Sequence, residues 1–188
     1  MGKSVVLAII TLGIVLAFVT YIGRQTFSQA NPKTGAVASR VNQVSITAIV
    51  QSINTAQATY NSRYPEQGYA PSLAALGAGG AADCKNADPP ASAEHACLMP
   101  DPEIATDSCS GDHWCDKDGY SFRLSCGSAS TPCNDYVIVA IPANANSAMT
   151  TAYCSTSDSM IHTGTFDPSA SSALPNISPD ECRTWQRM

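Results

Sequence analysis

Charge is scarce in this chain, and acidic charge is missing from its first part. Of its 188 residues 13% are charged, none of residues 4–23 carries a charge, and no acidic side chain precedes Glu66. The net charge is −5, and lysine and arginine do not cluster anywhere along the sequence. A nucleic-acid partner is therefore not expected, because contact with phosphate backbones requires a basic patch.

Catalytic signatures are missing as well. The sequence has no Gly-x-Ser-x-Gly elbow, no phosphate-binding loop and no paired-carboxylate motif. Its eight cysteines never form a Cys-x-x-Cys pair, which argues against a zinc knuckle and against a thioredoxin-like redox centre. The sequence therefore predicts a protein that is not an enzyme, with no cofactor, no metal and no evident small-molecule substrate.

Two short clusters leave metal binding open as the less favoured alternative. One offers thiolate and imidazole ligands for zinc, and the other offers carboxylate oxygens for calcium. The residues are Cys109, His113 and Cys115 for zinc, with His95 two residues before Cys97 as further ligands of this kind, and Asp112, Asp116 and Asp118 for calcium. Irregular cysteine spacing favours disulfides over zinc, and Trp114 between the aspartates favours a solvated turn before a strand over a calcium loop.

Residues 4–22 form an apolar run that is long enough to cross a membrane. At about 1.5 Å per residue, a helix of this length matches the roughly 30 Å hydrocarbon core of a bilayer. We therefore predict one transmembrane anchor helix within residues 1–30 and one globular domain over residues 31–188. The alternative is a cleaved signal peptide, since residues 28–30 (Ser-Gln-Ala) are of the kind that signal peptidases prefer and cleavage would release a soluble domain.

The eight cysteines place the globular domain outside the reducing cytosol. An even number of cysteines in a small domain is typical of disulfides, which form in oxidising compartments. We therefore expect a cell-membrane protein that crosses the membrane once, with its N-terminus inside and its C-terminal domain periplasmic or extracellular. Eight cysteines allow about 105 pairings, and proximity along the chain favours four bridges. These are Cys84–Cys97, Cys109–Cys115, Cys126–Cys133 and Cys154–Cys182.

A long amphipathic helix is predicted after a break at residues 31–35, where Asn-Pro-Lys-Thr-Gly interrupts a helix. Its apolar residues recur at spacings of three to five and form one stripe, while polar residues such as Asn54 fall elsewhere. The stripe comprises Val37, Val41, Val44, Ile49, Ile53, Ala56 and Tyr60. Residues 64–65 (Tyr-Pro) end this helix, and residues 68–77 contain a short helix with proline in its first turn.

Four segments are predicted to be strands. Residues 119–126 alternate bulky and polar side chains, and residues 135–141 are apolar on both faces and therefore central. Residues 150–154 and 160–162 pair across a polar turn. The predicted fold is α+β: a long N-terminal helix, membrane-spanning in its first half and interrupted near Pro32, packs on an antiparallel three- to four-stranded sheet with disulfide-stapled loops.

Five stretches of the sequence carry a resemblance to a known family. They are residues 53–60 (INTAQATY), 64–65 (YP), 68–77 (GYAPSLAALG), 96–98 (ACL) and 118–122 (DGYSF). In this order they resemble the bacterial type IV pilin-like proteins and type II secretion pseudopilins. The resemblance implies a helix that lies half in the membrane and half on an antiparallel sheet, and that bundles with the helices of other subunits in a filament.

The resemblance covers roughly residues 36–165 and sets the expected function. It implies a structural subunit whose partners are the membrane and other pilin-like subunits or assembly machinery. The N-terminus departs from the family pattern, because Gly2 is followed by Lys3 and the apolar run contains no glutamate to pair with a neighbouring subunit. We therefore expect a minor component of a type IV pilus or type II secretion pseudopilus. The alternative is a stand-alone, anchored or secreted binding module that does not polymerise.

Overall fold

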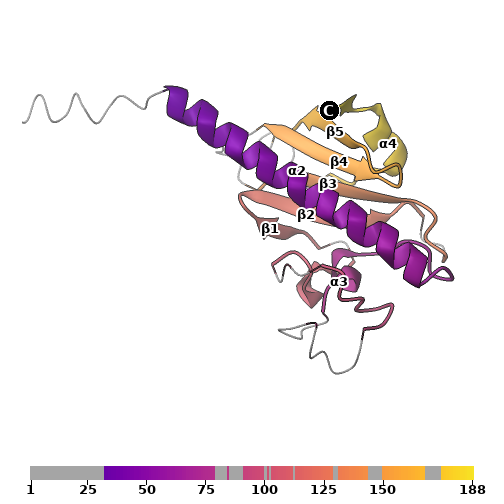
Figure 1. The fold of residues 1–188 in the computed structure, drawn as a ribbon. Helices are drawn as coiled ribbons and strands as arrows, with labels where there is room; N and C mark the ends of the chain where they lie inside the picture. Colours follow the sequence, from indigo (N-terminus) through magenta and orange to yellow (C-terminus); the bar gives the residue numbers. More distant parts are fainter. Residues whose placement is uncertain are drawn as a thin grey trace, which may run out of the picture. The chain divides into compact units, whose positions relative to one another are not determined.

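A computed structural model describes much of the predicted globular domain (Figure 1). The described residues are 32–78, 84, 91–99, 101, 103–111, 113–128, 131–143, 150–167 and 175–188. The chain divides into two units between Val41 and Asn42, and the second unit holds the sheet. The predicted anchor and the signal-peptide site lie outside the described residues, among which no helix is both long and apolar enough to span a membrane.

Helix α2 spans Pro32–Arg63 and ends where the sequence predicts. Pro65 disfavours a helical conformation at Tyr64, so the chain leaves the helix after Arg63. Proline is tolerated at the first position of a helix, because an N–H group there has no partner within the helix. The described helix therefore begins at Pro32, inside the segment that the sequence predicts as a break.

Six strands form one antiparallel sheet in which sequential strands are neighbours. Their bounds are Cys115–Lys117 (β1), Tyr120–Cys126 (β2), Tyr136–Pro142 (β3), Thr151–Thr156 (β4), Ile161–Thr165 (β5) and Gln186–Arg187 (β6). The four predicted strands correspond to β2–β5 and are confirmed. The prediction of three to four strands missed β1 and β6, which have only three and two residues. Strands this short show too little alternation to be recognised.

The β1–β2 hairpin accounts for part of the acidic cluster. Asp118 and Gly119 link the two strands, and both have positive φ angles, of 51° and 80°. Asp-Gly is a favoured pair for a two-residue hairpin turn, in which both residues need positive φ. The predicted exposed turn is therefore present, with a strand before it as well as after it.

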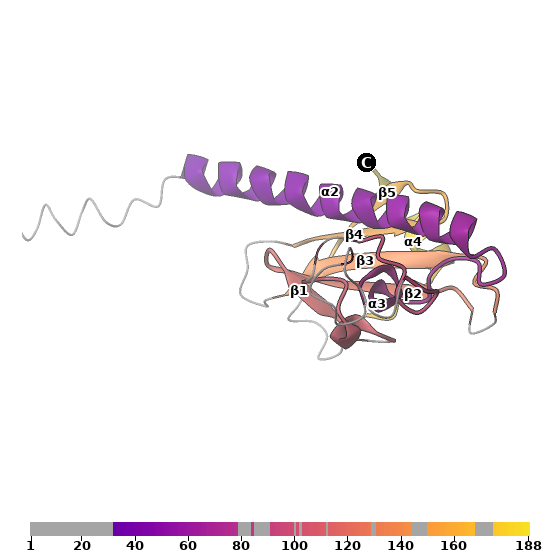
Figure 2. The ribbon, with the colours of Figure 1, turned by 60° about the horizontal axis from the view of Figure 1, so that its bottom comes forward.

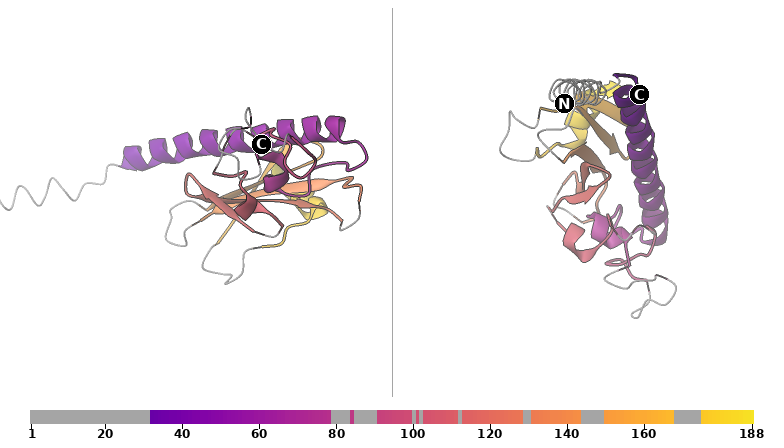
Figure 3. Two further views of the ribbon diagram at one scale, coloured as in Figure 1. Left: turned by 90° about the horizontal axis from the view of Figure 1, so that it is seen from below. Right: turned by 90° about the vertical axis from the view of Figure 1, so that its left-hand side faces the viewer.

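Residues 42–63 of α2 cover one face of the sheet (Figure 2). The side chains of α2 that are buried there are Ile46, Val50, Ile53, Ala56 and Tyr60. They form one hydrophobic core with side chains of strands β1–β5, including Phe122, Ile138 and Tyr153. Two further views show the sheet lying to one side of this part of α2 (Figure 3). The apolar stripe of the helix thus finds its partner surface on the sheet, as predicted.

The position of this stripe differs from the prediction in its first turns. The C-terminal half of the stripe is buried as predicted, but Val44 is 70% exposed. The prediction joined Val44 to Ile49 across five residues, and a step of five turns about 140° around a helix. The buried side chains follow steps of four and three instead, which stay on one face. Ile46 and Val50 lie on this face, so the assignment of Val44 was wrong and these two were missed.

The opposite face of the sheet is covered by the C-terminal segment. Helix α4 (Pro179–Thr184) packs there, and Val137, Val139 and Ile141 of β3 form a second hydrophobic cluster with Ile177. Every residue of β3 is buried. Burial from both sides explains why the sequence of β3 is apolar throughout, and its predicted central place in the sheet is confirmed.

A short helix, α3 (Leu73–Leu76), follows α2. The hydroxyl of Ser72 caps it by accepting a hydrogen bond from the N–H of Ala75 at 3.4 Å. The predicted short helix is therefore confirmed, although Pro71 lies before the capping residue and not in the first turn. All four residues of α3 are buried, so this helix also contributes to the core beside α2.

Candidate functional site

Three of the four predicted bridges are present in the described residues. They are Cys109–Cys115, Cys126–Cys133 and Cys154–Cys182. The first two close short loops that begin or end at strands β1 and β2. The third joins residues 28 positions apart and ties the C-terminal segment to β4. The predicted pairing is therefore confirmed, while its role in pinning a tail with little apolar content stays a prediction.

The fourth predicted bridge is not formed, so the pairing of Cys84 with Cys97 was wrong. The N–H of Cys97 donates to the carbonyl oxygen of Gly77 at 2.9 Å, and the φ angle of Cys97 is 52°. The sequence does not reveal this backbone geometry. Closeness in sequence alone does not bring two sulfur atoms within bonding distance.

Four members of the two candidate metal clusters have other partners. The two cysteines of the zinc cluster are bonded to each other and so offer no thiolate. Asp116 accepts a hydrogen bond from the Ser121 hydroxyl at 2.5 Å, and Asp118 accepts one from the Ser45 hydroxyl at 3.2 Å. Asp112 lies outside the described residues. Within the described part of the chain, no three potential metal ligands come together.

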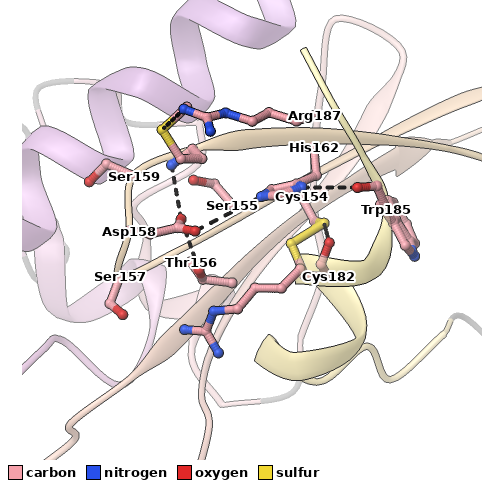
Figure 4. A network of polar contacts seen from close by, with 12 residues as sticks. Cys154, Ser155, Thr156, Ser157, Asp158, Ser159, His162, Cys182, Trp185 and Arg187 are labelled. Atoms are coloured by element: carbon pink, nitrogen blue, oxygen red, sulfur yellow. Dashed lines mark hydrogen bonds and ion pairs between the residues drawn. A yellow bond between two sulfur atoms is a disulfide. The ribbon is translucent and has the colours of Figure 1, made fainter.

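The C-terminal segment is held beside strands β4 and β5 by a buried histidine as well as by a disulfide (Figure 4). Cys154 bonds to Cys182, and His162 stands opposite Cys154 in the sheet. His162 is 7% exposed, and its Nδ1 atom lies 3.1 Å from the carbonyl oxygen of Trp185. A carbonyl oxygen only accepts, so Nδ1 carries the hydrogen of this bond. His162 therefore positions the C-terminal segment.

An ion pair joins the start of β3 to α4. The guanidinium of Arg183 donates to Asp135 Oδ2 at 2.6 Å, and the N–H of Tyr136 donates to Asp135 Oδ1 at 2.9 Å. Burial opposes ionisation of Asp135, but hydrogen bonds from Arg183 and Ser157 outweigh it and lower the pKa of this carboxyl group. The hydrogen bond to Asp135 in turn raises the pKa of Arg183. The carboxylate is thus a fixed anion at neutral pH.

The buried side of α2 carries two polar side chains among the apolar ones. Asn54 accepts a hydrogen bond from the Tyr136 hydroxyl and donates one to the Ser155 hydroxyl, both at 2.9 Å. Gln57 donates to and accepts from the backbone of Ala70, at 3.0 and 2.7 Å. Burial raises the pKa of Tyr136, so its hydroxyl remains a donor. These contacts fix the helix on the sheet, and the sequence interpretation placed Asn54 on the wrong side.

The other side of α2 presents a surface that we call the exposed helix face. Its residues are Val44, Ala48, Gln51, Ser52, Thr55, Ala58, Thr59 and Ser62. No charged residue occurs between Arg40 and Arg63. The four serine and threonine hydroxyls each donate to the carbonyl oxygen four residues before, at 2.9–3.0 Å. These four hydroxyls need no outside partner, so the face is uncharged and, apart from Gln51, consists of apolar side chains and hydroxyls bonded to their own helix.

His162 and Asp158 form a histidine–carboxylate pair beside the turn between β4 and β5, but their contacts are structural. The Nε2 atom of His162 lies 4.0 Å from Asp158 Oδ2, beyond hydrogen-bond distance. Asp158 Oδ1 accepts from the hydroxyl of Thr156 and from the N–H of Met160, at 3.0 and 2.9 Å. The carboxylate therefore shapes the turn between β4 and β5.

Compared with known proteins, the chain matches no family model, no curated protein and no solved structure. A functional assignment therefore depends on the geometry of the described residues and on the resemblance carried by the sequence. Two features of that geometry lie at the surface and are accessible to a partner. They are the exposed helix face and an open cleft at the end of α2.

Proposed function

We propose that this chain is a structural, pilin-like subunit that joins a type IV pilus or a type II secretion pseudopilus as a minor component. The observation that carries the proposal is the packing of α2 residues 42–63 on one face of an antiparallel sheet. This is the arrangement that the sequence resemblance implies. In this function the N-terminal segment anchors the chain in the cell membrane, and the disulfide-rich domain lies in the periplasm or outside the cell.

The exposed helix face supports a role in contacts between subunits. Small side chains allow the backbones of two helices to approach closely. Hydroxyls that bond to their own helix keep that hydrogen bond when another helix packs over them. Surface helices of soluble proteins ordinarily carry charged residues on the side away from the core. Here that side carries none between Arg40 and Arg63, which suits packing against another helix.

A second candidate function follows from the missing acidic residue near the N-terminus. No acidic side chain precedes Glu66, so the pairing that the family resemblance would require between neighbouring subunits has no partner in this chain. Without that pair, apolar helices pack with weak axial register. This observation favours a stand-alone, membrane-anchored or secreted binding module as the alternative, and within the main proposal it favours a minor subunit over a homopolymer.

A shearing experiment distinguishes the two proposed functions. The chain is expressed in cells with and without pilus or pseudopilus assembly machinery, filaments are sheared off, and the sheared fraction is probed for the protein. A minor subunit appears there in small amounts together with other pilin-like subunits, and only when the machinery is present. Complete absence from the sheared fraction in every background would overturn the proposal in favour of the stand-alone module. Abundant filaments of this chain alone would contradict the minor role.

A further inference from the structure

An open cleft of about 640 Å³ lies where the end of α2, helix α3 and the loop closed by Cys126 and Cys133 meet. Residues 93–95 and the turn at Asp107–Cys109 complete its walls. Clefts of roughly 300–1,000 Å³ are the usual size of ligand sites. The side chains used below are Tyr69, Glu94, His95 and Asp107, which all line this cleft.

The fixed charge of the cleft is negative. Glu94 and Asp107 line it, and its described lining contains no lysine or arginine. A hydrogen bond from the Ser92 hydroxyl to Glu94 Oε2, at 2.9 Å, lowers the pKa of Glu94, so this carboxylate is ionised at neutral pH. The side chain of Asp107 is 62% exposed and therefore accessible to a ligand. An anionic ligand is therefore disfavoured.

Two polar side chains of the cleft lie close together without a hydrogen bond between them. The Nδ1 atom of His95 is buried and lacks a hydrogen-bond partner within the described residues, and Asp107 Oδ1 lies 3.8 Å from it. That separation is too long for a hydrogen bond between the two groups. A ligand N–H group placed here would donate to Asp107 Oδ1, and also to His95 Nδ1 when the imidazole hydrogen is on Nε2. An ammonium or guanidinium group offers several such donors together with the complementary charge.

An aromatic ring stands in the same cleft. The N–H of Tyr69 donates to the carbonyl oxygen of Cys133 at 2.8 Å, and its ring packs edge-on against Tyr136 with the ring centroids 4.8 Å apart. The ring is thus held in place before any ligand arrives. The face of a tyrosine ring attracts ammonium and guanidinium cations. The aromatic ring and the two carboxylates favour the same chemistry.

We propose that this cleft binds a cationic peptide segment through its lysine or arginine side chains. Two carboxylates on different walls suit a segment that carries at least two such side chains. Residues of the cleft and of the exposed helix face do not overlap. Binding here therefore does not depend on assembly into a filament, and it holds for a minor subunit and for a stand-alone module alike.

The test uses the full-length chain in a mild non-ionic detergent and a lysine tetrapeptide amide as the probe. Binding is measured by calorimetry, and the same peptide with its four side-chain amines acetylated serves as the ligand control, since acetylation removes the charge. The double substitution Glu94→Gln with Asp107→Asn should weaken binding of the unmodified peptide about tenfold, because it removes both carboxylates of the cleft. The acetylated peptide should not bind measurably.

A matched variant excludes a general effect of net charge. Asp180→Asn with Glu181→Gln removes the same two charges from α4, outside the cleft, and should leave binding within about twofold of the unmodified protein. Tyr69→Leu tests the ring and should weaken binding about fivefold. Equal binding of the two peptides, or equal loss of affinity in the two double variants, would overturn the proposal. Circular dichroism confirms that each variant is folded before its affinity is compared.

Discussion

The two faces of the sheet are covered in different ways. A long helix covers one face through a continuous apolar core, with the contacts of Asn54 as a polar element inside it. A short C-terminal segment covers the other face, where it depends on the Cys154–Cys182 bridge, a buried histidine and an ion pair. The six residues of α4 bury too little apolar surface to keep the helix packed on the sheet by burial alone. A disulfide therefore stabilises this side, whereas hydrophobic burial stabilises the side under α2.

Removing the Cys154–Cys182 bridge should give the largest effect. Its cysteines are 28 residues apart, and for a loop of this length the entropy of the unfolded chain corresponds to about 3.6 kcal/mol. Urea unfolding of a Cys154→Ala, Cys182→Ala variant measures the loss. The comparison is the Cys109–Cys115 bridge, whose separation of six residues predicts a smaller loss of about 2 kcal/mol. The opposite order would show that the C-terminal segment does not rely on its bridge.

Ile53→Ala should give the next largest effect, on the face under α2. Ile53 is fully buried, and truncation of such a side chain costs about 3 kcal/mol through lost burial and the cavity left behind. Val44→Ala on the same helix is the control, because Val44 is 70% exposed and should change the free energy of unfolding by less than about 0.5 kcal/mol. Similar losses of stability at both positions would mean that a different side of α2 faces the sheet.

Asn54→Ala tests the polar contacts that fix the helix on the sheet. The substitution leaves the Tyr136 hydroxyl without its acceptor and should reduce the free energy of unfolding by about 2 kcal/mol. In a double-mutant cycle with Tyr136→Phe, the two losses should not add, since both remove the same hydrogen bond. Additive losses would show that the two side chains are not coupled. Gln51→Ala, on the exposed helix face, should have almost no effect.

Acid should reduce the free energy of unfolding through the C-terminal side of the sheet, and this loss should be the smallest of the four effects. The pKa of Asp135 is lowered in the folded state, so its contribution is complete above the unfolded-state pKa of about 3.9 and is lost as pH falls through the lower, folded-state pKa. Because the side chain is partly exposed, the loss should be less than about 1 kcal/mol. Unfolding measured below pH 4 should show this loss in the parent chain and not in Asp135→Asn. An identical acid response of both would exclude this carboxylate as the source.

Much of the fold follows from sequence patterns of adequate length. Strands β2–β5, the end of α2 before Pro65 and three bridges between nearby cysteines all rest on periodicity, proline geometry or proximity, which are local properties. Three of the errors have one cause. Val44, Asn54 and the Cys84–Cys97 pairing were each assigned from local spacing, whereas tertiary packing decides which way a helix is rotated and which side chains meet.

The candidate surfaces were only partly visible in the sequence. The absence of charge between Arg40 and Arg63 can be read directly, but its meaning appears only once the hydroxyls of that side are seen to bond to their own helix. The cleft could not have been predicted, because Tyr69, His95 and Asp107 come from three separate segments. Only the packing of those segments around the end of α2 brings them together.

The most direct test of the proposed function places a large charge on the exposed helix face. Thr55→Arg places a good helix former at an exposed position, so the fold should be retained. The long charged side chain should block close packing against another helix. Thr184→Arg is the matched control, because Thr184 is also exposed and also donates its hydroxyl to its own helix, in α4. In sheared fractions from cells with assembly machinery, Thr184→Arg should be present at the level of the parent chain and Thr55→Arg should be absent. Equal incorporation of the two variants would contradict assembly through this face.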